Sequence, residues 1–281
     1  MSNRNLVVGM IAALCLSGCA VRITESDILL PGAYAALDRS VLERRAPGYG
    51  FEPQTILAPD GVTLSGVLLR RPRATLTILY FGGNTFRVGQ NGAAVAARLA
   101  PANANLMLVD HRGAGTSGGT PSIAALPGDA LAIFDHLAAQ PGISPSRIMV
   151  HGHSLGSFMA GDVAAERDTA GVVLESSATT TEAWARAVLP AAARPVVRFD
   201  IAESLRGQGN LANMAQIQEP VLVLVGARDE TTPPSLSRAL YAAGAGDAGR
   251  KHLMIVPGAG HNDVLRHDEG MAAYMAFVRS L

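Results

Sequence analysis

The chain has 281 residues, of which 48% are hydrophobic and 16% charged, a balance that suits one globular domain with a sizeable apolar core. Acidic and basic side chains cancel to a formal net charge of zero, which gives no electrostatic case for a nucleic-acid partner. The two cysteines, Cys15 and Cys19, leave the rest of the chain without a disulfide or a thiol nucleophile, and no Cys/His cluster has zinc spacing, so we expect no metal and no cofactor.

The first residues predict an export signal. Arg4 precedes an apolar run over residues 6–16, which is too short to span a bilayer because a spanning helix needs about 20 residues. The run ends in Leu16-Ser17-Gly18-Cys19, which resembles the bacterial lipobox, where cleavage before the cysteine leaves it lipid-modified. We therefore expect a signal peptide over residues 1–18 and a membrane anchor on Cys19. The alternative is an ordinary signal peptide with an incidental cysteine. By the same resemblance, Ala20 favours sorting to the outer membrane of a bacterial cell envelope.

Residues 19–50 show no sustained pattern and contain the breaks Pro31-Gly32 and Ala46-Pro47-Gly48, so we expect an N-terminal tether with one helix. The main domain is expected to cover residues 51–281. Apolar runs flank Pro59-Asp60-Gly61 at its start, and this arrangement predicts a β-hairpin.

From residue 76 onward, predicted strands and helices alternate. Strands are expected over residues 76–81, 105–110, 147–151, 171–175, 220–226 and 252–257, with helices over 89–100, 124–139, 155–167, 234–243 and 264–280. Near-continuous apolar strands separated by helices indicate an α/β fold with a mostly parallel sheet covered on both faces. Residues 178–218 break the alternation and predict a short helical lid over the carboxyl ends of the strands, where open α/β sheets bind ligands.

One strand ends in Gly152-His153-Ser154-Leu155-Gly156, which fits the G-x-S-x-G nucleophile elbow. In this motif the serine occupies a strained turn between a strand and a helix, and the glycines allow neighbouring backbone to approach closely. An apolar strand before the motif and a helical pattern after it supply the expected context. The pattern alone is also compatible with an ordinary strand-to-helix turn.

A serine nucleophile needs a base and an acid that orients the base. Asp229 follows the predicted strand 220–226, and His261 lies in a glycine-rich loop after the strand 252–257. Glu230 and Glu175 remain alternative acids, since the first is adjacent to Asp229 and the second ends a strand of its own. The order serine, aspartate, histidine is that of α/β-hydrolases.

Two further motifs complete a family resemblance. Leu79-Tyr80-Phe81-Gly82-Gly83-Asn84 resembles the α/β-hydrolase strand that ends in His-Gly-Asn, although Gly82 stands where the family often has histidine. The loop from Asp110 to Gly118 resembles the family's Asp-x-Arg-Gly-x-Gly-x-Ser loop. Residues 51–281 thus resemble the α/β-hydrolase fold, in particular its small-lid branch of serine esterases and serine aminopeptidase-like proteins. The glycines of the second motif lack the lysine of a P-loop, which favours a structural turn over a phosphate site.

The resemblance implies a catalytic triad of Ser154 as nucleophile, His261 as base and Asp229 as its orienting acid. It also implies an oxyanion hole built from the backbone N–H groups of Asn84 and Leu155. We expect a lipid-anchored serine hydrolase that cleaves small carboxylic esters or thioesters through an acyl-enzyme on Ser154. The alternatives are a peptidase or amidase, an envelope-lipid hydrolase, and a non-catalytic binding lipoprotein that keeps the fold.

Overall fold

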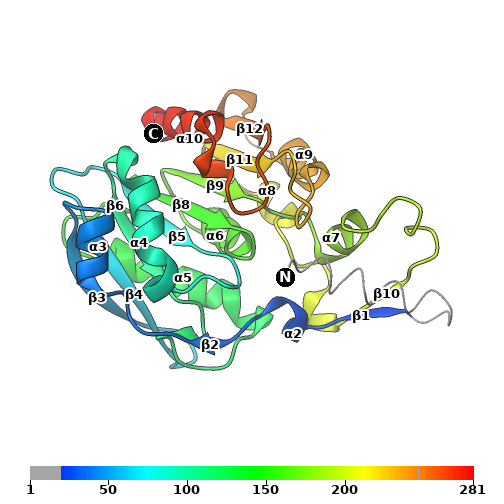
Figure 1. Cartoon of the computed structure of the whole chain (residues 1–281), viewed down its shortest axis with the longest axis horizontal. Helices are drawn as coiled ribbons and strands as arrows, with labels where there is room; N and C mark the ends of the chain where they lie inside the picture. Colours follow the sequence, from blue (N-terminus) through cyan, green and yellow to red (C-terminus); the bar gives the residue numbers. More distant parts are fainter. Residues whose placement is uncertain (1–19, 246) are drawn as a thin grey trace.

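An eight-stranded sheet forms the centre of the molecule (Figure 1). The computed structural model describes residues 20–245 and 247–281, so the predicted signal peptide and Cys19 lie outside the described residues. Along the sheet the strands are ordered β12-β11-β9-β8-β5-β6-β4-β3. Their bounds are β3 (Gly50–Leu57), β4 (Thr63–Arg70), β5 (Thr77–Phe81), β6 (Asn105–Val109), β8 (Ile148–His153), β9 (Gly171–Glu175), β11 (Val221–Gly226) and β12 (Lys251–Val256).

The sheet is parallel except at one edge. β3 and β4 form the antiparallel hairpin expected around the Pro-Asp-Gly turn, and β4 also pairs antiparallel with β6. All the other pairings of this sheet are parallel. This arrangement confirms the predicted α/β fold class.

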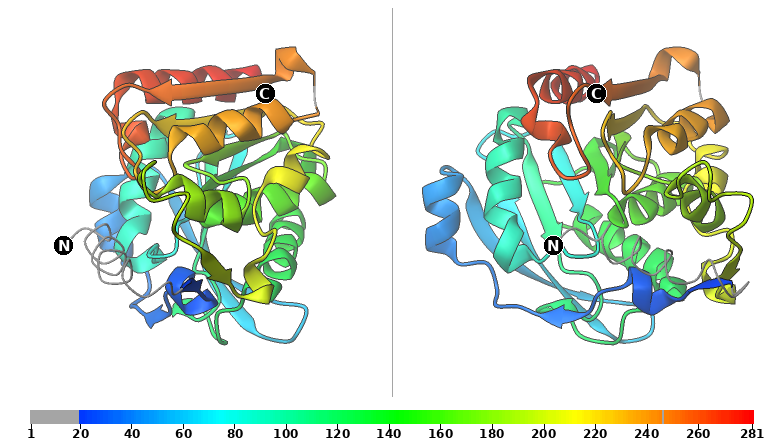
Figure 2. Two further views of the ribbon diagram at one scale, coloured as in Figure 1. Left: turned by 90° about the vertical axis from the view of Figure 1, so that its right-hand side faces the viewer. Right: turned by 45° about the vertical axis from the view of Figure 1, so that its right-hand side comes forward.

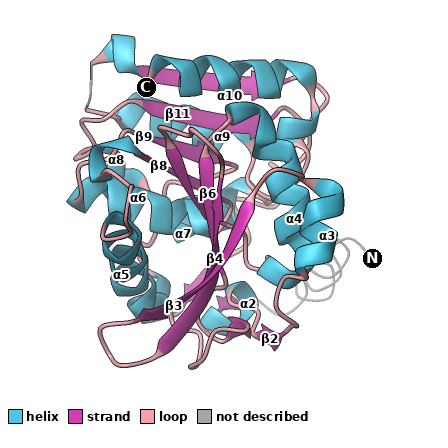
Figure 3. Ribbon diagram, turned by 90° about the vertical axis from the view of Figure 1, so that its left-hand side faces the viewer, coloured by secondary structure: helices cyan, strands magenta, loops and turns pink. Residues whose placement is uncertain are grey.

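Helices cover both faces of the sheet, as Figure 3 shows from the side of the hairpin. One apolar core is shared with α5 (Leu126–Ala138), α6 (Gly156–Glu166) and α9 (Pro234–Ala243), and the other with α3 (Arg39–Arg45), α4 (Val88–Leu99) and α10 (Asp268–Ser280). Successive strand residues enter opposite cores: Ile78 lies in the second and Leu79 in the first. Because both faces are covered, the central strands β5, β6, β9 and β11 are buried along their whole length, and each buried aliphatic side chain contributes about 1.5–3 kcal/mol.

Residues 20–49 contain more structure than the single helix that the sequence predicts. They form β1 (Val21–Ile23), α2 (Glu25–Ile28), β2 (Gly32–Ala33) and α3. β1 pairs in parallel with β10 (Phe199–Ile201), and β2 pairs in parallel with β7 (Ala114–Gly115), so this segment joins two distant parts of the chain (Figure 2). Two of its leucines are built into the cores, since Leu29 is 6% and Leu42 is 1% exposed.

The 178–218 segment lies between β9 and β11. It contains α7 (Thr181–Ala187), β10, the short 3-10 helix η4 (Glu203–Leu205) and α8 (Leu211–Met214). Further 3-10 turns complete the described elements: η1 (Ala100–Ala102), η2 (Ile123–Ala125), η3 (Pro145–Arg147), η5 (Ala248–Arg250) and η6 (Val264–Arg266). In the part of the chain that the structure describes, no helix combines the length and apolar character needed to cross a membrane.

Candidate active site

Ser154 lies in the turn between β8 and α6, with a left-handed backbone at φ 54°. This conformation is unfavourable for a residue with a side chain and marks a strained turn. The flanking glycines have a steric reason: a Cβ on Gly152 would meet the Gly156 carbonyl oxygen at 2.3 Å, and one on Gly156 would meet the Phe81 carbonyl oxygen at 2.2 Å. The elbow therefore needs glycine two positions before and two positions after the serine.

The structure brings together the three predicted triad residues. Ser154 Oγ lies 3.0 Å from His261 Nε2, and His261 Nδ1 lies 2.9 Å from Asp229 Oδ2. Each residue stands just beyond the carboxyl end of a parallel strand, namely β8, β12 and β11. An ionised Asp229 can only accept, so the His261 proton resides on Nδ1 and Nε2 is left to accept the proton of the Ser154 hydroxyl.

Asp229 is held as an anion by its surroundings. Its side chain is buried, and its Oδ1 accepts hydrogen bonds from Thr231 N over 2.9 Å and from Thr232 N over 2.8 Å. The Thr232 hydroxyl lies 2.9 Å from Oδ2. Burial pushes the pKa of Asp229 upward, but the hydrogen bond and charge of His261 and the bonds from Thr232 outweigh burial, so the pKa lies below its ordinary value.

The alternative acids differ from Asp229, one in exposure and the other in the partner of its carboxylate. Glu230 is exposed, whereas Asp229 beside it is buried. The Glu175 carboxylate lies 2.9 Å from His151 Nε2 in the sheet interior, and Tyr274 Oη lies 3.3 Å from the other nitrogen of that ring. The backbone carbonyl of Glu175, not its carboxylate, accepts from Ser154 N over 2.9 Å.

One predicted oxyanion donor lies within the elbow and the other in the loop beside it. Leu155 follows Ser154 directly, and the Asn84 loop follows β5, the strand next to β8. A Cβ on Gly83 would stand 3.4 Å from the Ser154 Cβ, so this loop reaches the nucleophile. Among residues 20–245 and 247–281, the backbone N–H groups of Asn84 and Leu155 donate to no protein acceptor, which leaves both for a substrate oxygen.

Gly82 stands where the family often has histidine, and glycine is required here because Phe86 leaves no room for a side chain. A Cβ at this position would stand 2.1 Å from Cγ of Phe86, so the Phe86 ring occupies the space that a side chain would need. His111 Nε2 lies 2.7 Å from the Gly82 carbonyl oxygen, and Arg87 donates to the carbonyl of Asn84 over 3.0 Å. The loop is therefore stiffened by the side chains of His111 and Arg87 rather than by one at position 82.

The Asp110 loop is a structural turn. Asp110 accepts from Val88 N over 2.7 Å and from Thr116 N over 3.0 Å. Gly115 has φ 56°, and a Cβ there would meet the Asp110 carboxylate at 2.1 Å. The Arg112 guanidinium pairs with the Asp60 and Asp129 carboxylates, so it is not directed at a phosphate.

Three contacts around the base were not evident from the sequence. His153 Nε2 lies 2.9 Å from the His261 carbonyl oxygen, Trp184 Nε1 donates to Thr231 O over 2.8 Å, and Gly260 N donates to Asp263 Oδ1 over 2.6 Å. Of these residues, only His153 could have been singled out from the sequence, because it is adjacent to Ser154 in the motif.

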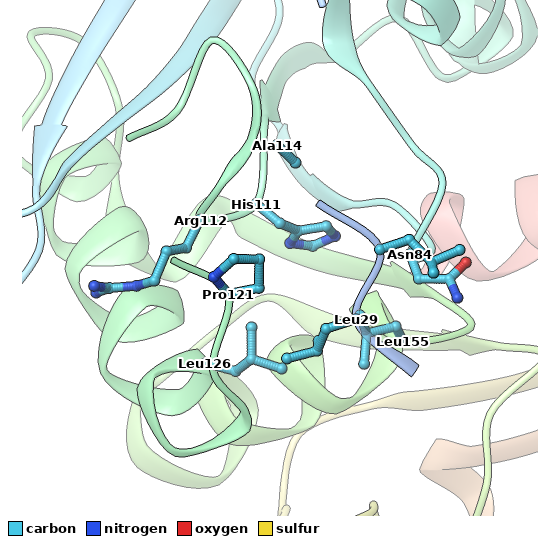
Figure 4. A pocket seen from close by; sticks show the side chains of 9 residues that line it. Leu29, Asn84, His111, Arg112, Ala114, Pro121, Leu126 and Leu155 are labelled. Atoms are coloured by element: carbon cyan, nitrogen blue, oxygen red, sulfur yellow. The ribbon is translucent and has the colours of Figure 1, made fainter. Parts of the chain in front are cut away.

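An apolar recess adjoins the oxyanion loop (Figure 4). It measures about 300 Å³, part of which is open to solvent, and it meets the site through Asn84 and Leu155; Ser154 and His261 do not line it. Its lining residues are Leu29, Leu30, Asn84, His111, Arg112, Ala114, Pro121, Leu126 and Leu155. Among the described residues we find no group of three or more histidine, cysteine, aspartate or glutamate side chains that could hold a metal ion.

Comparison with known proteins gives a family match over part of the chain. A family model described as "Serine aminopeptidase, S33" matches residues 78–210, which include Ser154 but neither Asp229 nor His261. An uncharacterised protein of Mycobacterium tuberculosis is 35% identical over 159 residues, which make up 57% of this chain and 53% of that protein. The chain thus aligns with about half the length of this relative.

Two further proteins align over more of the chain. "Alpha/beta hydrolase domain-containing protein 17B" of Xenopus tropicalis is 29% identical over 74% of this chain and 67% of its own length. The solved structure of the Pyrococcus furiosus esterase Pf2001 has a TM-score of 0.71 and 19% identity, and covers 90% of this chain and 98% of its own. The likeness in three dimensions shows that the chain has the α/β-hydrolase fold.

Proposed function

We propose that this chain, which has the α/β-hydrolase fold, is a serine hydrolase that cleaves small carboxylic esters or thioesters through an acyl-enzyme on Ser154. The observation that carries the proposal is the hydrogen-bonded series from Ser154 Oγ through His261 to Asp229, with separations of 3.0 Å and 2.9 Å. Support also comes from the relatives named as hydrolases and esterases. A fold alone does not specify a reaction, whereas this geometry is suited to acyl transfer and therefore supports the proposal.

In the first half-reaction, Ser154 Oγ attacks the substrate carbonyl carbon while His261 Nε2 takes the hydroxyl proton. The histidine becomes a cation, which the Asp229 carboxylate stabilises through the Nδ1–H bond. The proton then passes to the leaving alcohol or thiol as the carbon–oxygen or carbon–sulfur bond breaks. Ser154 is left carrying the acyl group.

In the second half-reaction, His261 removes a proton from water, and the resulting hydroxide attacks the acyl carbon. The proton returns to Ser154 Oγ, which releases the carboxylic acid and restores the enzyme. In both halves the carbonyl oxygen becomes an oxyanion, which accepts hydrogen bonds from the N–H groups of Asn84 and Leu155. One such donor is worth roughly 3 kcal/mol of transition-state stabilisation in a preorganised site.

The amide alternative is an aminopeptidase, as the description of the matched family suggests. An aminopeptidase must hold a substrate ammonium group, and a carboxylate is the usual partner for it. Among the described residues that line the recess, none is acidic. This favours an uncharged acyl group over an amino-terminal residue.

The location of the enzyme is part of the proposal. Cys19 follows a signal-like segment, so processing before it would leave a lipid-anchored enzyme in a bacterial envelope, in the outer membrane. The test is fractionation of cells that express the full chain or its Cys19→Ala variant. Recovery of both proteins in the soluble fraction would contradict the anchor without bearing on the hydrolase.

The hydrolase itself is tested with p-nitrophenyl esters and a fluorophosphonate probe, which labels activated serines. We expect the wild type to turn over short esters and to take up the probe. Ser154→Ala should lose the label, and its turnover should fall by at least about 10⁴-fold. Aminoacyl anilides serve as the competing substrates. A folded wild type that neither hydrolyses any of these substrates nor reacts with the probe would leave a binding lipoprotein as the better account.

A further inference from the structure

A segment near the N-terminus crosses the molecule beside the candidate site. Residues 24–34, here called the strap, lie between β1 and the Asp110 loop (Figure 2). At one end, β1 pairs with β10. At the other end, Gly32 N donates to Gly113 O over 3.1 Å, and Tyr34 N donates to Gly115 O over 3.0 Å. The strap is therefore fixed at both ends by main-chain hydrogen bonds to parts of the chain far away in sequence.

Arg87 joins the middle of the strap to the oxyanion loop. Its side chain is buried, and within the described residues it forms no ion pair. It donates to four main-chain carbonyls, two on its own loop and two on the strap: Asn84, Phe86, Leu30 and Gly32. In addition, Asn84 Nδ2 donates to Ile28 O over 3.0 Å. Buried guanidinium donors need acceptors, and here the carbonyls supply them, so the strap and the loop form one hydrogen-bonded unit.

The strap also supplies one wall of the apolar recess. Leu29 and Leu30 line it from the strap. Leu126 and Leu155 line it from the main domain, and Figure 4 shows both of them beside Leu29. Leu155 carries one of the two predicted oxyanion donors, so the recess adjoins a residue that would bind the carbonyl oxygen. The room that a bound group could occupy in it is about 20 Å³, a little more than one water molecule needs, so the recess is narrow.

The two ionisable residues of the recess offer no charge to a ligand. The His111 ring is bonded to the Gly82 carbonyl, and burial lowers its pKa, which keeps the imidazole neutral near neutral pH. The Arg112 guanidinium extends away from Leu29 and Leu155 to its two carboxylate partners (Figure 4). A short aliphatic chain therefore suits the recess better than a charged group.

We infer that the strap forms the outer wall of the acyl pocket, and that Leu29 and Leu30 limit the acyl chain to a short, uncharged one. The inference rests on the proposed hydrolase function, because it assigns the recess to the acyl part of that substrate. A carbonyl oxygen bound by Asn84 and Leu155 directs the acyl chain along Leu155 towards Leu29. Chain length is then determined by residues that lie more than 100 positions before Ser154 in the sequence.

The test compares p-nitrophenyl esters from acetate to decanoate on the full-length protein and three variants. Leu29→Ala removes part of the wall, so the ratio of kcat/KM for octanoate over butanoate should rise about tenfold. Leu30→Trp narrows the recess, and the same ratio should fall about tenfold. Leu37→Ala is the matched control, because Leu37 is also a leucine near the N-terminus with 6% exposure, but it lies in the other core cluster.

A shift of the ratio in opposite directions for Leu29→Ala and Leu30→Trp, with no shift for Leu37→Ala, would support the inference. Wild-type turnover that depends on Ser154, combined with an unchanged length profile in both strap variants, would overturn the inference and leave the proposed function intact. Absence of turnover in the wild type would instead overturn the proposed function, and the pocket assignment with it. Because Leu30 is 39% exposed, we expect Leu30→Trp to fold, and this variant tests the inference by itself if Leu29→Ala does not fold.

Discussion

The ring of His153 donates a hydrogen bond from Nε2 to the main-chain carbonyl of His261 over 2.9 Å, so the residue before the candidate nucleophile holds the loop of the candidate base. A carbonyl oxygen can only accept, which places a proton on this nitrogen. Desolvation lowers the pKa of His153, so the ring is neutral near neutral pH. The two imidazole rings lie 5.1 Å apart, and a neutral His153 puts no positive charge beside His261.

We expect His153→Phe to lower kcat about tenfold while leaving KM nearly unchanged. Phenylalanine keeps a ring in place but cannot donate to the His261 carbonyl, and a hydrogen bond of this kind is worth roughly 1 kcal/mol. Steady-state kinetics on a short ester measure the effect. His153→Gln keeps a donor and should recover part of the rate. Equal rates for the wild type and His153→Phe would show that the contact does not position the base.

Asp229 and Glu175, the two buried acid candidates, can be separated by a matched pair of amide substitutions. Asp229→Asn should lower kcat about 10⁴-fold, because an amide can donate to His261 Nδ1 and thereby favour the wrong tautomer. Glu175→Gln should change kcat less than about threefold, since its side chain contacts His151 rather than His261. The measurement is kcat for both variants on one ester. A larger loss in Glu175→Gln than in Asp229→Asn would reverse the assignment.

The depressed pKa of Asp229 also predicts how stability varies with pH. The pKa is lower in the folded chain than its unfolded value of about 3.9, so the folded state binds protons less readily. The stabilising contribution of the carboxylate is complete above the unfolded pKa and is lost as the pH falls through the folded pKa. The free energy of unfolding should therefore fall more for the wild type than for Asp229→Asn between about pH 5 and about pH 2. Urea unfolding at several pH values measures this, and a steeper fall in Asp229→Asn would contradict it.

Gly82 tests the explanation for the missing family histidine. A methyl group on Gly82 would overlap the Phe86 side chain, so Gly82→Ala should reduce the free energy of unfolding by about 1–3 kcal/mol. Gly128 is a matched control near the start of α5, where the nearest atom to an added Cβ is 3.5 Å away. Gly128→Ala should be neutral or stabilising by up to about 1 kcal/mol. Similar denaturation midpoints for the two variants would rule out the steric explanation.

The sheet and its helices could be predicted because their sequence signals are long. The expected helix at 89–100 forms as α4 (Val88–Leu99), and the expected strand at 171–175 forms as β9 (Gly171–Glu175). In each case an apolar run faces a covered layer, so burial and local pattern favour the same structure. Most element ends differ by one or two residues, since the first and last turns depend on individual caps. The helix expected over 264–280 differs more: residues 264–266 form the separate 3-10 turn η6, and α10 begins at Asp268.

The meeting of Ser154, Asp229 and His261 could be expected because each follows a strand, and parallel strands end at one edge. The choice between acids could not be made on that basis, since Glu175 also ends a strand. It depends on the direction of the side chain. Glu175 is the register partner of His153, yet its carboxylate turns to His151, two residues back along β8.

The strap could not be predicted from the sequence, for a different reason. The strap is held by short strand pairings and by its main-chain carbonyls, which accept hydrogen bonds from Arg87. These contacts do not require a periodic pattern of hydrophobic residues. Nothing in the pattern of residues 24–34 distinguishes this segment from a tether, because hydrogen bonds to a backbone leave no residue signature. Only the folded chain brings Leu29 into the wall of the recess.

The role of Arg87 as a positioning residue can be tested through the chemistry rather than through stability alone. Arg87→Met removes the donors that hold the Asn84 carbonyl and the strap, so the loop can shift relative to Ser154. A small misplacement of an oxyanion donor can cost about 100-fold in rate, and we expect this loss in kcat with little change in KM. Arg87→Lys keeps a charge and three donors, enough for part of the carbonyl set, and should recover part of kcat. Thermal unfolding of both variants separates local from global effects: if kcat follows the loss of folded protein in both, Arg87 stabilises the fold without aligning the site.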